Sequence, residues 1–143
     1  MNLYLDASAI VKLFFEEPGS QVVEESVARA ERNGTSMISY VEVRAALARR
    51  EREGSFLSGT YLVAVSEFER GWPDYRIVEL EAPIARMAGD LAQTRALRAL
   101  DALHLASALF LKDSGVASLS FLSADRRLRA AAQAEGLNTI VLG

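Results

Sequence analysis

Short apolar runs alternate along this chain with longer stretches whose apolar residues recur at every third or fourth position. The run NLYL at residues 2–5 is apolar enough to be a strand buried on both faces. The same reasoning predicts further strands at residues 35–39, 76–80, 118–123 and 138–142. Helical spacing predicts helices at residues 7–15, 20–33, 40–53, 57–70, 83–96, 100–113 and 125–135.

Strands that alternate with helices form a parallel sheet covered by helices on both faces. The expected fold is therefore a three-layer α/β/α domain with a central parallel sheet of four to five strands, rich in helix. The 143 residues, half of them apolar, are enough for one hydrophobic core. Because no linker, repeat or low-complexity segment divides the chain, we expect a single domain over residues 1–143.

The composition excludes several classes of chemistry. The chain has no cysteine, which rules out disulfides, zinc–thiolate sites and thiol nucleophiles. No apolar run approaches the ~20 residues of a membrane-spanning helix, and the first residues lack the basic segment of a signal peptide. We therefore expect a cytoplasmic protein with no membrane partner.

The basic residues are almost all arginine, since only Lys12 and Lys112 are lysine. Arginine suits bidentate contact with phosphate, but a GC-rich genome also raises arginine use. Two groups lie where they can meet a polyanion, and both can equally be solvated helix faces. These groups are Arg44, Arg49 and Arg50, and Arg126, Arg127 and Arg129.

Four acidic residues stand in apolar surroundings or at the junctions between strands and helices. Asp6 follows the first strand, Glu42 lies in SYVEVRAAL, Asp101 in LRALDALHLASAL and Asp125 in FLSADRRLRAAA. A buried carboxylate is unfavourable unless it is paired, hydrogen-bonded or bound to a metal. Taken singly, each of these acids can simply stabilise the first turn of a helix.

Taken together, the acids favour a metal site. The carboxyl ends of parallel strands share one edge of the sheet, so Asp6, Glu42 and Asp125 are expected there. Carboxylates brought close together repel one another unless a cation lies between them. Mg²⁺ or Mn²⁺ match such oxygen ligands, and a cation of this kind can activate water and stabilise charge on a phosphoryl oxygen. The sole histidine, His104, lies three residues after Asp101 and can be a core residue or part of this site.

The segments LDASAIVKL, ISYVEVRAAL, LDALHLASAL and FLSADRRLRAAA resemble, in order and context, the four acidic signatures of PIN-domain ribonucleases. The closest resemblance is to VapC-like toxins of type II toxin–antitoxin systems, and it extends from residue 2 to about residue 142. It implies an endoribonuclease dependent on Mg²⁺ or Mn²⁺. Such an enzyme hydrolyses RNA to 5′-phosphate and 3′-hydroxyl ends and inhibits translation or growth.

The resemblance also assigns roles to individual residues. Asp6, Glu42, Asp101 and Asp125 would be the catalytic acids and metal ligands, with Asp6 and Asp101 as direct ligands and Asp125 at the family's most variable acidic position. Three further residues would contact the acids or the substrate phosphate, namely Ser8, Ser123 and Arg126. The segment QTRALRALD lacks the glycine that many relatives carry before the third acid, which leaves the helix break there undefined.

The partners implied are an RNA substrate, a small antitoxin that often inserts an arginine among the acids, and a second copy in a homodimer. Tyr61, Leu62, Val65 and Phe68 offer an apolar helix face that can serve the dimer or the core. Two alternatives stay open: a PIN nuclease of RNA processing outside toxin–antitoxin systems, and a PIN module that binds without catalysis. A phosphatase of the haloacid dehalogenase type is disfavoured, because Ser8 stands where a second acid is required.

Overall fold

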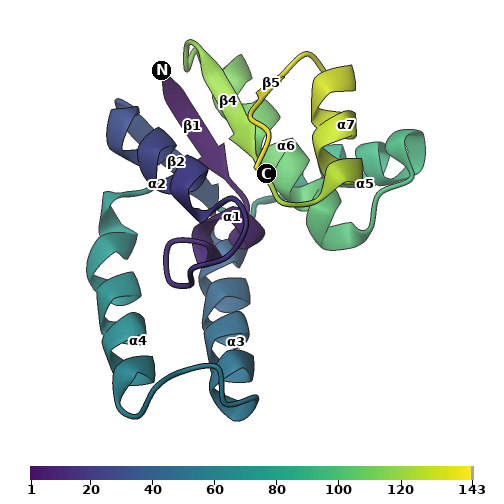
Figure 1. Cartoon of the computed structure of the whole chain (residues 1–143). Coiled ribbons are helices and arrows are strands. Elements are labelled where there is room, and N and C mark those ends of the chain that lie inside the picture. The colour runs from purple at the N-terminus through teal and green to yellow at the C-terminus, as the bar shows by residue number, and fades with distance from the viewer. Residues whose placement is uncertain (143) are drawn as a thin grey trace.

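A five-stranded parallel sheet with the order β3-β2-β1-β4-β5 lies at the centre of the molecule (Figure 1). The computed structural model describes residues 1–142. The strands are β1 (Asn2–Leu5), β2 (Arg32–Ser36), β3 (Arg76–Val78), β4 (Leu119–Leu122) and β5 (Asn138–Thr139). The helices are α1 (Ala7–Val11), α2 (Ser20–Arg29), α3 (Ile38–Arg52), α4 (Thr60–Gly71), α5 (Ala82–Arg95), α6 (Ala99–Asp113) and α7 (Arg126–Ala134), with a short 3-10 helix η1 (Trp72–Asp74).

The two faces of the sheet are covered by different helices, which confirms the predicted three-layer α/β/α fold. Alternate residues of a strand point to opposite faces. Leu3 and Leu5 accordingly belong to a core shared with α1, α2, α3 and α4. Tyr4, between them, belongs to a second core shared with α5, α6 and α7, where its ring stacks on Phe121 of β4 at 5.5 Å between centroids.

The second strand begins earlier than the sequence pattern predicts. A helix over 20–33 followed by a strand over 35–39 was expected, but α2 ends at Arg29 and β2 already includes Asn33 and Gly34. Gly34 does not end a helix. A Cβ atom there would lie 2.8 Å from Leu111 Cδ1, so the glycine lets α6 approach the sheet closely.

The first helix is shorter than predicted, because the chain after Val11 continues in turns with backbone hydrogen bonds from Lys12 to Ala9 and from Leu13 to Ile10, and a partly buried ion pair follows. α1 ends at Val11, and Lys12 donates from Nζ to Glu17 Oε1 at 3.1 Å and to the Pro18 carbonyl at 2.7 Å. Arg50 of α3 donates to the other oxygen of Glu17 at 2.8 Å. This bridge ties the loop after α1 to α3.

Helices α3 and α4 pack against each other and extend away from the sheet as an arm (Figure 1). Aromatic contacts of Tyr40, Phe68 and Trp72 fill the space between them near the sheet. The face of α4 considered for a dimer is mostly part of this core: Phe68 is buried, and Tyr61 and Val65 pack against it. Only Leu62 of that set is free to meet a partner, at 71% exposed.

Among the described residues, no helix is both long enough and apolar enough to cross a membrane.

The break between α5 and α6, which the sequence left undefined, is made by an alanine in the left-handed conformation. Ala96 has φ 53° and ψ 44° and ends α5, and Arg98 then caps α6 with extended backbone. A non-glycine residue in this conformation costs roughly 1–2 kcal/mol. Helices usually end with glycine at such a position.

We expect Ala96→Gly to stabilise the protein by about 1 kcal/mol. Glycine removes the left-handed strain at this position, and its greater conformational entropy in the unfolded chain offsets part of that gain. Thermal unfolding should show a midpoint raised by about 3 °C. The matched control Ala85→Gly, at an exposed position inside α5, should instead lower stability by about 1 kcal/mol. Equal destabilisation by both changes would contradict the strain at Ala96.

Candidate active site

Asp6 ends β1 and begins α1, and its carboxylate serves as the N-cap of that helix. Its Oδ1 atom accepts from the Ala9 backbone N–H at 3.0 Å and from the Ser8 hydroxyl at 2.6 Å. The residue is only 5% exposed. Burial raises the pKa of Asp6, while the charge of His104 and the hydroxyls of Ser123 and Ser8 oppose that rise. The carboxylate is thus held in place and poorly solvated.

Glu42 lies in the second turn of α3 and meets α6 at the same edge of the sheet. Its Oε1 atom is 2.7 Å from Nε2 of His104. The other ring nitrogen, Nδ1, is 2.7 Å from the hydroxyl of Tyr4 on β1. His104 is 2% exposed, so the sole histidine is a buried residue and also a direct neighbour of a predicted site acid.

Asp101 and Asp125 face each other across Arg98. Asp101 is in the first turn of α6, and Asp125 is the N-cap of α7, where Oδ1 accepts from the backbone N–H groups of Arg127 and Leu128. Arg98 lies 3.5 Å from Asp101 Oδ2 and 3.8 Å from Asp125 Oδ2. Since Arg98 is highly exposed (86%), these are loose contacts that a stronger cation can replace.

The structure therefore brings the four predicted acids to one edge of the sheet as two linked sets. Asp101 and Asp125 share Arg98, whereas Asp6 and Glu42 both lie near His104. Within residues 1–142, no three Asp, Glu or His side chains stand close enough together to enclose a metal ion as they are. Mg²⁺ needs only one or two carboxylates, because it retains waters and takes further oxygens from substrate phosphates. The oxygen donors at this edge fit that requirement.

Two hollows flank the acids. One of about 550 Å³ is lined by Ser8 and Glu42 and, along α3, by Arg49, Arg50 and Arg52. The other, of about 250 Å³, is lined by Arg98, Asp101, Asp125 and Arg127. The two hollows are adjacent along the chain, because Ala124 lines the first and the next residue, Asp125, lines the second. A chain that crosses the acids would thus meet arginines on both sides.

The two serines of the predicted site have different positions. Ser8 lines the larger hollow, donates to Asp6 and accepts from the backbone N–H of Ala124 at 2.9 Å, so it links the ends of β1 and β4. Ser123 is fully buried and accepts from the backbone N–H of Asp125 at 3.0 Å. Ser123 thus orients an acid, and among the two only Ser8 faces a hollow that a substrate can enter.

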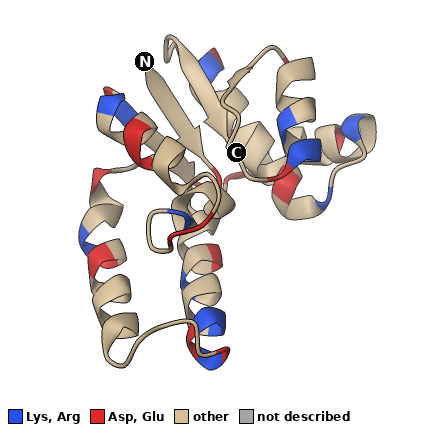
Figure 2. Ribbon diagram, viewed as in Figure 1, with Lys and Arg blue, Asp and Glu red and all other residues tan. Residues whose placement is uncertain are grey.

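The arginine groups divide into structural and accessible members. Arg44 pairs with Glu69 at 2.8 Å, Arg50 with Glu17, and Arg129 donates to the Ser123 carbonyl at 2.8 Å. Arg49, Arg126 and Arg127 are exposed. Figure 2 shows the basic residues at the far end of α3, on the arm. Arg127 and Arg49 line the hollows; Arg126 lies on the surface at the start of α7.

Sequence reasoning missed two residues of this site, Tyr4 and Arg98. A tyrosine inside a buried strand needs a partner for its hydroxyl, and the sole histidine was an available candidate. Arg98 stands three residues before Asp101, the spacing at which side chains meet on a helix. Its second contact, with Asp125, depends on the tertiary fold and cannot be predicted from the local sequence.

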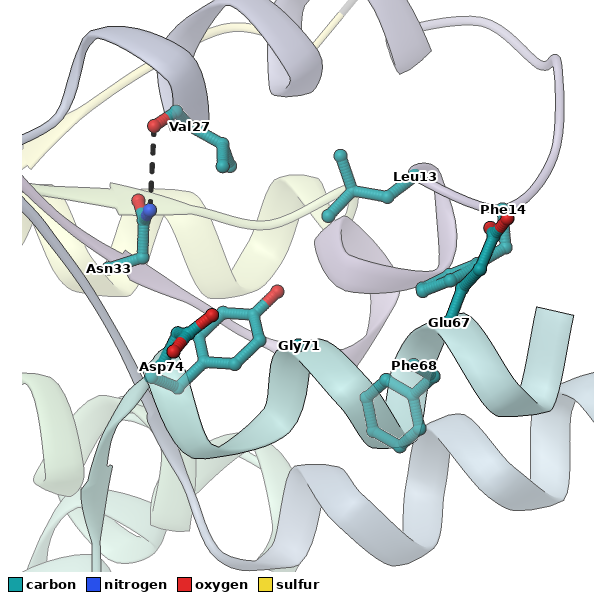
Figure 3. A pocket seen from close by; sticks show the side chains of 9 residues that line it. Leu13, Phe14, Val27, Asn33, Glu67, Phe68, Gly71 and Asp74 are labelled. Atoms are coloured by element: carbon teal, nitrogen blue, oxygen red, sulfur yellow. Dashed lines mark hydrogen bonds between the residues drawn. The ribbon is translucent and has the colours of Figure 1, made fainter.

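A further cavity of about 310 Å³ lies away from the acids, between α2 and α4 (Figure 3). Its walls are largely apolar, with Leu13, Phe14 and Phe68 among them. Asn33 Oδ1 is buried there without a hydrogen-bond partner among the described residues. Burial raises the pKa of Tyr75, another wall residue, to about 12, so its hydroxyl stays neutral.

Comparison with known proteins adds to this geometry. A family model described as the PIN domain matches residues 3–134. Ribonuclease VapC45 of Mycobacterium tuberculosis (strain CDC 1551 / Oshkosh) is 40% identical over 134 residues, which are 94% of this chain and 91% of that protein.

Two solved structures share the fold. One is a toxin–antitoxin complex from Klebsiella pneumoniae, with a TM-score of 0.62, 18% identity and 86% of each chain covered. The other is VapBC-1 from nontypeable Haemophilus influenzae, with a TM-score of 0.67, 17% identity, and 99% of this chain and 98% of that chain covered.

We expect Asp6→Asn to raise the thermal unfolding midpoint of the metal-free protein at neutral pH, measured in EDTA. The pKa of Asp6 is higher in the folded protein than in the unfolded chain. The stability that this carboxyl group contributes is therefore present at pH values below the unfolded pKa, and it is lost as the pH rises through the folded pKa. Neutral pH lies above the unfolded pKa, so the carboxyl group lowers the stability of the folded protein there, and asparagine caps a helix as well as aspartate does. The exposed control Glu24→Gln should leave the midpoint unchanged; a lower midpoint for Asp6→Asn would contradict the prediction.

Proposed function

The chain belongs to the PIN-domain family, and from this premise we propose that it is an endoribonuclease that depends on Mg²⁺ or Mn²⁺ and acts as the toxin of a toxin–antitoxin pair. The observation that carries the proposal is the buried carboxylate of Asp6, which shares one sheet edge with Glu42, Asp101 and Asp125. The 40% identity with a protein called a ribonuclease supports the same activity.

Asp6 and Asp101 would hold the cation, with Glu42 and Asp125 as further ligands or orienting groups. When bound there, Mg²⁺ or Mn²⁺ supplies a Lewis acid that activates water and stabilises charge on the phosphoryl oxygens. Asp6 is fixed by its cap hydrogen bonds and by Ser8. Because its position is set before substrate arrives, little reorganisation is needed during the reaction.

The RNA backbone would cross the acids between the two hollows. Arg49 on one side, and Arg98 and Arg127 on the other, would contact phosphates, which dominate the affinity of proteins for nucleic acids. Arg98 would then exchange Asp101 and Asp125 for a phosphate. Ser8 is placed to contact the phosphate next to Asp6.

The proposed partner is a small antitoxin, supported by the fold shared with proteins solved as toxin–antitoxin complexes. The largely apolar cavity of Figure 3 offers such a segment apolar contact. A homodimer is also proposed, for which Leu62 and Val63 on α4 are exposed apolar residues. A cytoplasmic location suits an RNA substrate.

The purified protein, free of antitoxin, should cut total cellular RNA when Mg²⁺ or Mn²⁺ is added, and EDTA should stop the reaction. Asp6→Asn should lower the rate at least 100-fold, because loss of a pre-organised charged group costs about that much. Glu24→Gln, an exposed acid on α2, should cut as the wild type does. End-sequencing should find 5′-phosphates. A folded protein that cuts nothing with either metal would indicate a binding module.

Induced expression in a bacterial host should stop the incorporation of labelled amino acids into protein within minutes if the enzyme is a toxin. Asp6→Asn, expressed to the same level, should leave incorporation unchanged because its nuclease activity is lost. An RNA-processing nuclease would give a different outcome: cleavage in vitro with normal incorporation in the cell. That result would separate the nuclease activity from the toxin role.

A further inference from the structure

Two buried groups and one partly exposed acid form a continuous hydrogen-bonded ladder that ends at the acidic site. Tyr4 of β1, His104 of α6 and Glu42 of α3 are joined by two contacts of 2.7 Å each. The residues are 100 and 62 positions apart in sequence, so only the tertiary fold brings them together. Figure 1 shows the three elements that carry them. The ladder runs from the interior of the sheet to the edge where the acids lie.

The hydrogen-bonding capacity of the three groups sets the direction of the ladder. An ionised carboxylate only accepts, so Nε2 of His104 carries the hydrogen and donates to Glu42. The Tyr4 hydroxyl, 2.7 Å from Nδ1, can either donate or accept, so it pairs with that nitrogen whether or not the nitrogen carries a hydrogen. Burial and the charges of Asp6 and Glu42 raise the pKa of Tyr4 well above its ordinary value, so the hydroxyl keeps its proton. The donor to Glu42 is therefore Nε2, and Tyr4 holds the ring from its other nitrogen.

We infer that His104, itself oriented by Tyr4, is the positioning residue of Glu42 and holds that carboxylate toward the site acids. This inference rests on the proposed function. Glu42 is partly exposed and has three rotatable side-chain bonds, and it lines the same hollow as Arg49 and Arg50. Repulsion from the neighbouring acids and attraction to these arginines would both draw it away from the sheet edge. The bond from His104 opposes that movement and leaves Oε2 for the site.

The alternative is a core histidine whose polar atoms are merely satisfied. Both explanations expect a loss of stability when the ring is removed, because the partners of a buried polar group are then left unpaired. They differ in whether the effect on cleavage passes through Glu42. Removal of a group that orients a metal-site ligand typically costs 10- to 100-fold in activity or metal affinity.

The first test needs neither RNA nor metal. His104 is the only histidine in the chain, so ¹⁵N-histidine labelling gives one pair of ring signals, and their shifts report which nitrogen carries the hydrogen. The expected result is hydrogen on Nε2 in the wild type and in Tyr4→Phe, because Glu42 still accepts from it, whereas the Nδ1 signal should shift in Tyr4→Phe because that nitrogen loses its partner. A wild type whose Nε2 carries no hydrogen, or one with averaged tautomers, would overturn the ladder.

The second test measures cleavage by five variants. His104→Leu should lower kcat about 10- to 100-fold with KM unchanged within twofold. His104→Gln, whose amide nitrogen can still donate to Glu42, should recover most of that loss. In a Glu42→Gln background, His104→Leu should cause no further loss, since the acid through which it acts is gone. Leu109→Val, a buried change on the same helix, controls for a modest loss of stability.

Equal losses from His104→Leu with and without Glu42 would overturn the inference, as would a His104→Gln variant no better than His104→Leu. Thermal unfolding checks that each variant is folded. If His104→Leu does not fold, Tyr4→Phe takes its place, because it removes one hydroxyl and keeps the ring. A wild type that cuts no RNA contradicts the proposed function, and the tautomer measurement then decides separately whether the ladder holds.

Discussion

Negative charge gathered at the carboxyl edge of the sheet is the constraint that the rest of this structure accommodates. Asp6 is nearly buried, and burial alone raises its pKa. Its hydrogen bonds to Ala9 and Ser8 hold it there by making it the cap of α1. The neighbouring acids are compensated differently, Glu42 by His104, and Asp101 and Asp125 by Arg98. Each acid therefore has a structural partner that a bound cation can supplement or replace.

The parallel topology makes this gathering unavoidable. β1 lies between β2 and β4, and all strands run in the same direction. Whatever follows each strand must therefore emerge at one edge. Because Leu3, Tyr4 and Leu5 point alternately to the two faces of the sheet, one of these residues lies on the face covered by α5, α6 and α7. That residue is Tyr4, which is how a strand in the interior comes to influence an acid at the edge.

The local sequence predicted which helices and strands form better than it predicted the residues at which they begin and end. Strand and helix order followed from apolar spacing, and the positions of Asp6 and Asp125 at the starts of helices followed from capping preferences. The start of β2 was predicted too late, because Asn33-Gly34 is a pair of residues that commonly ends a helix. In the structure Gly34 lies inside the strand, where the close contact of Leu111 with the backbone requires a glycine. The same limit applies to Arg50 and Arg129: their partners Glu17 and Ser123 are set by the fold, so accessible arginines could not be separated from structural ones.

The order of the strands also determines when this site can exist. β1 (Asn2–Leu5) precedes the other strands of the sheet, yet one of its two neighbours is β4, formed by Leu119–Leu122. Asp125 and the contact between Ser8 and Ala124 depend on that late strand. Pairings so distant in sequence form slowly, since a long loop must close first. A chain whose synthesis has not yet passed Asp125 therefore has no assembled acidic centre.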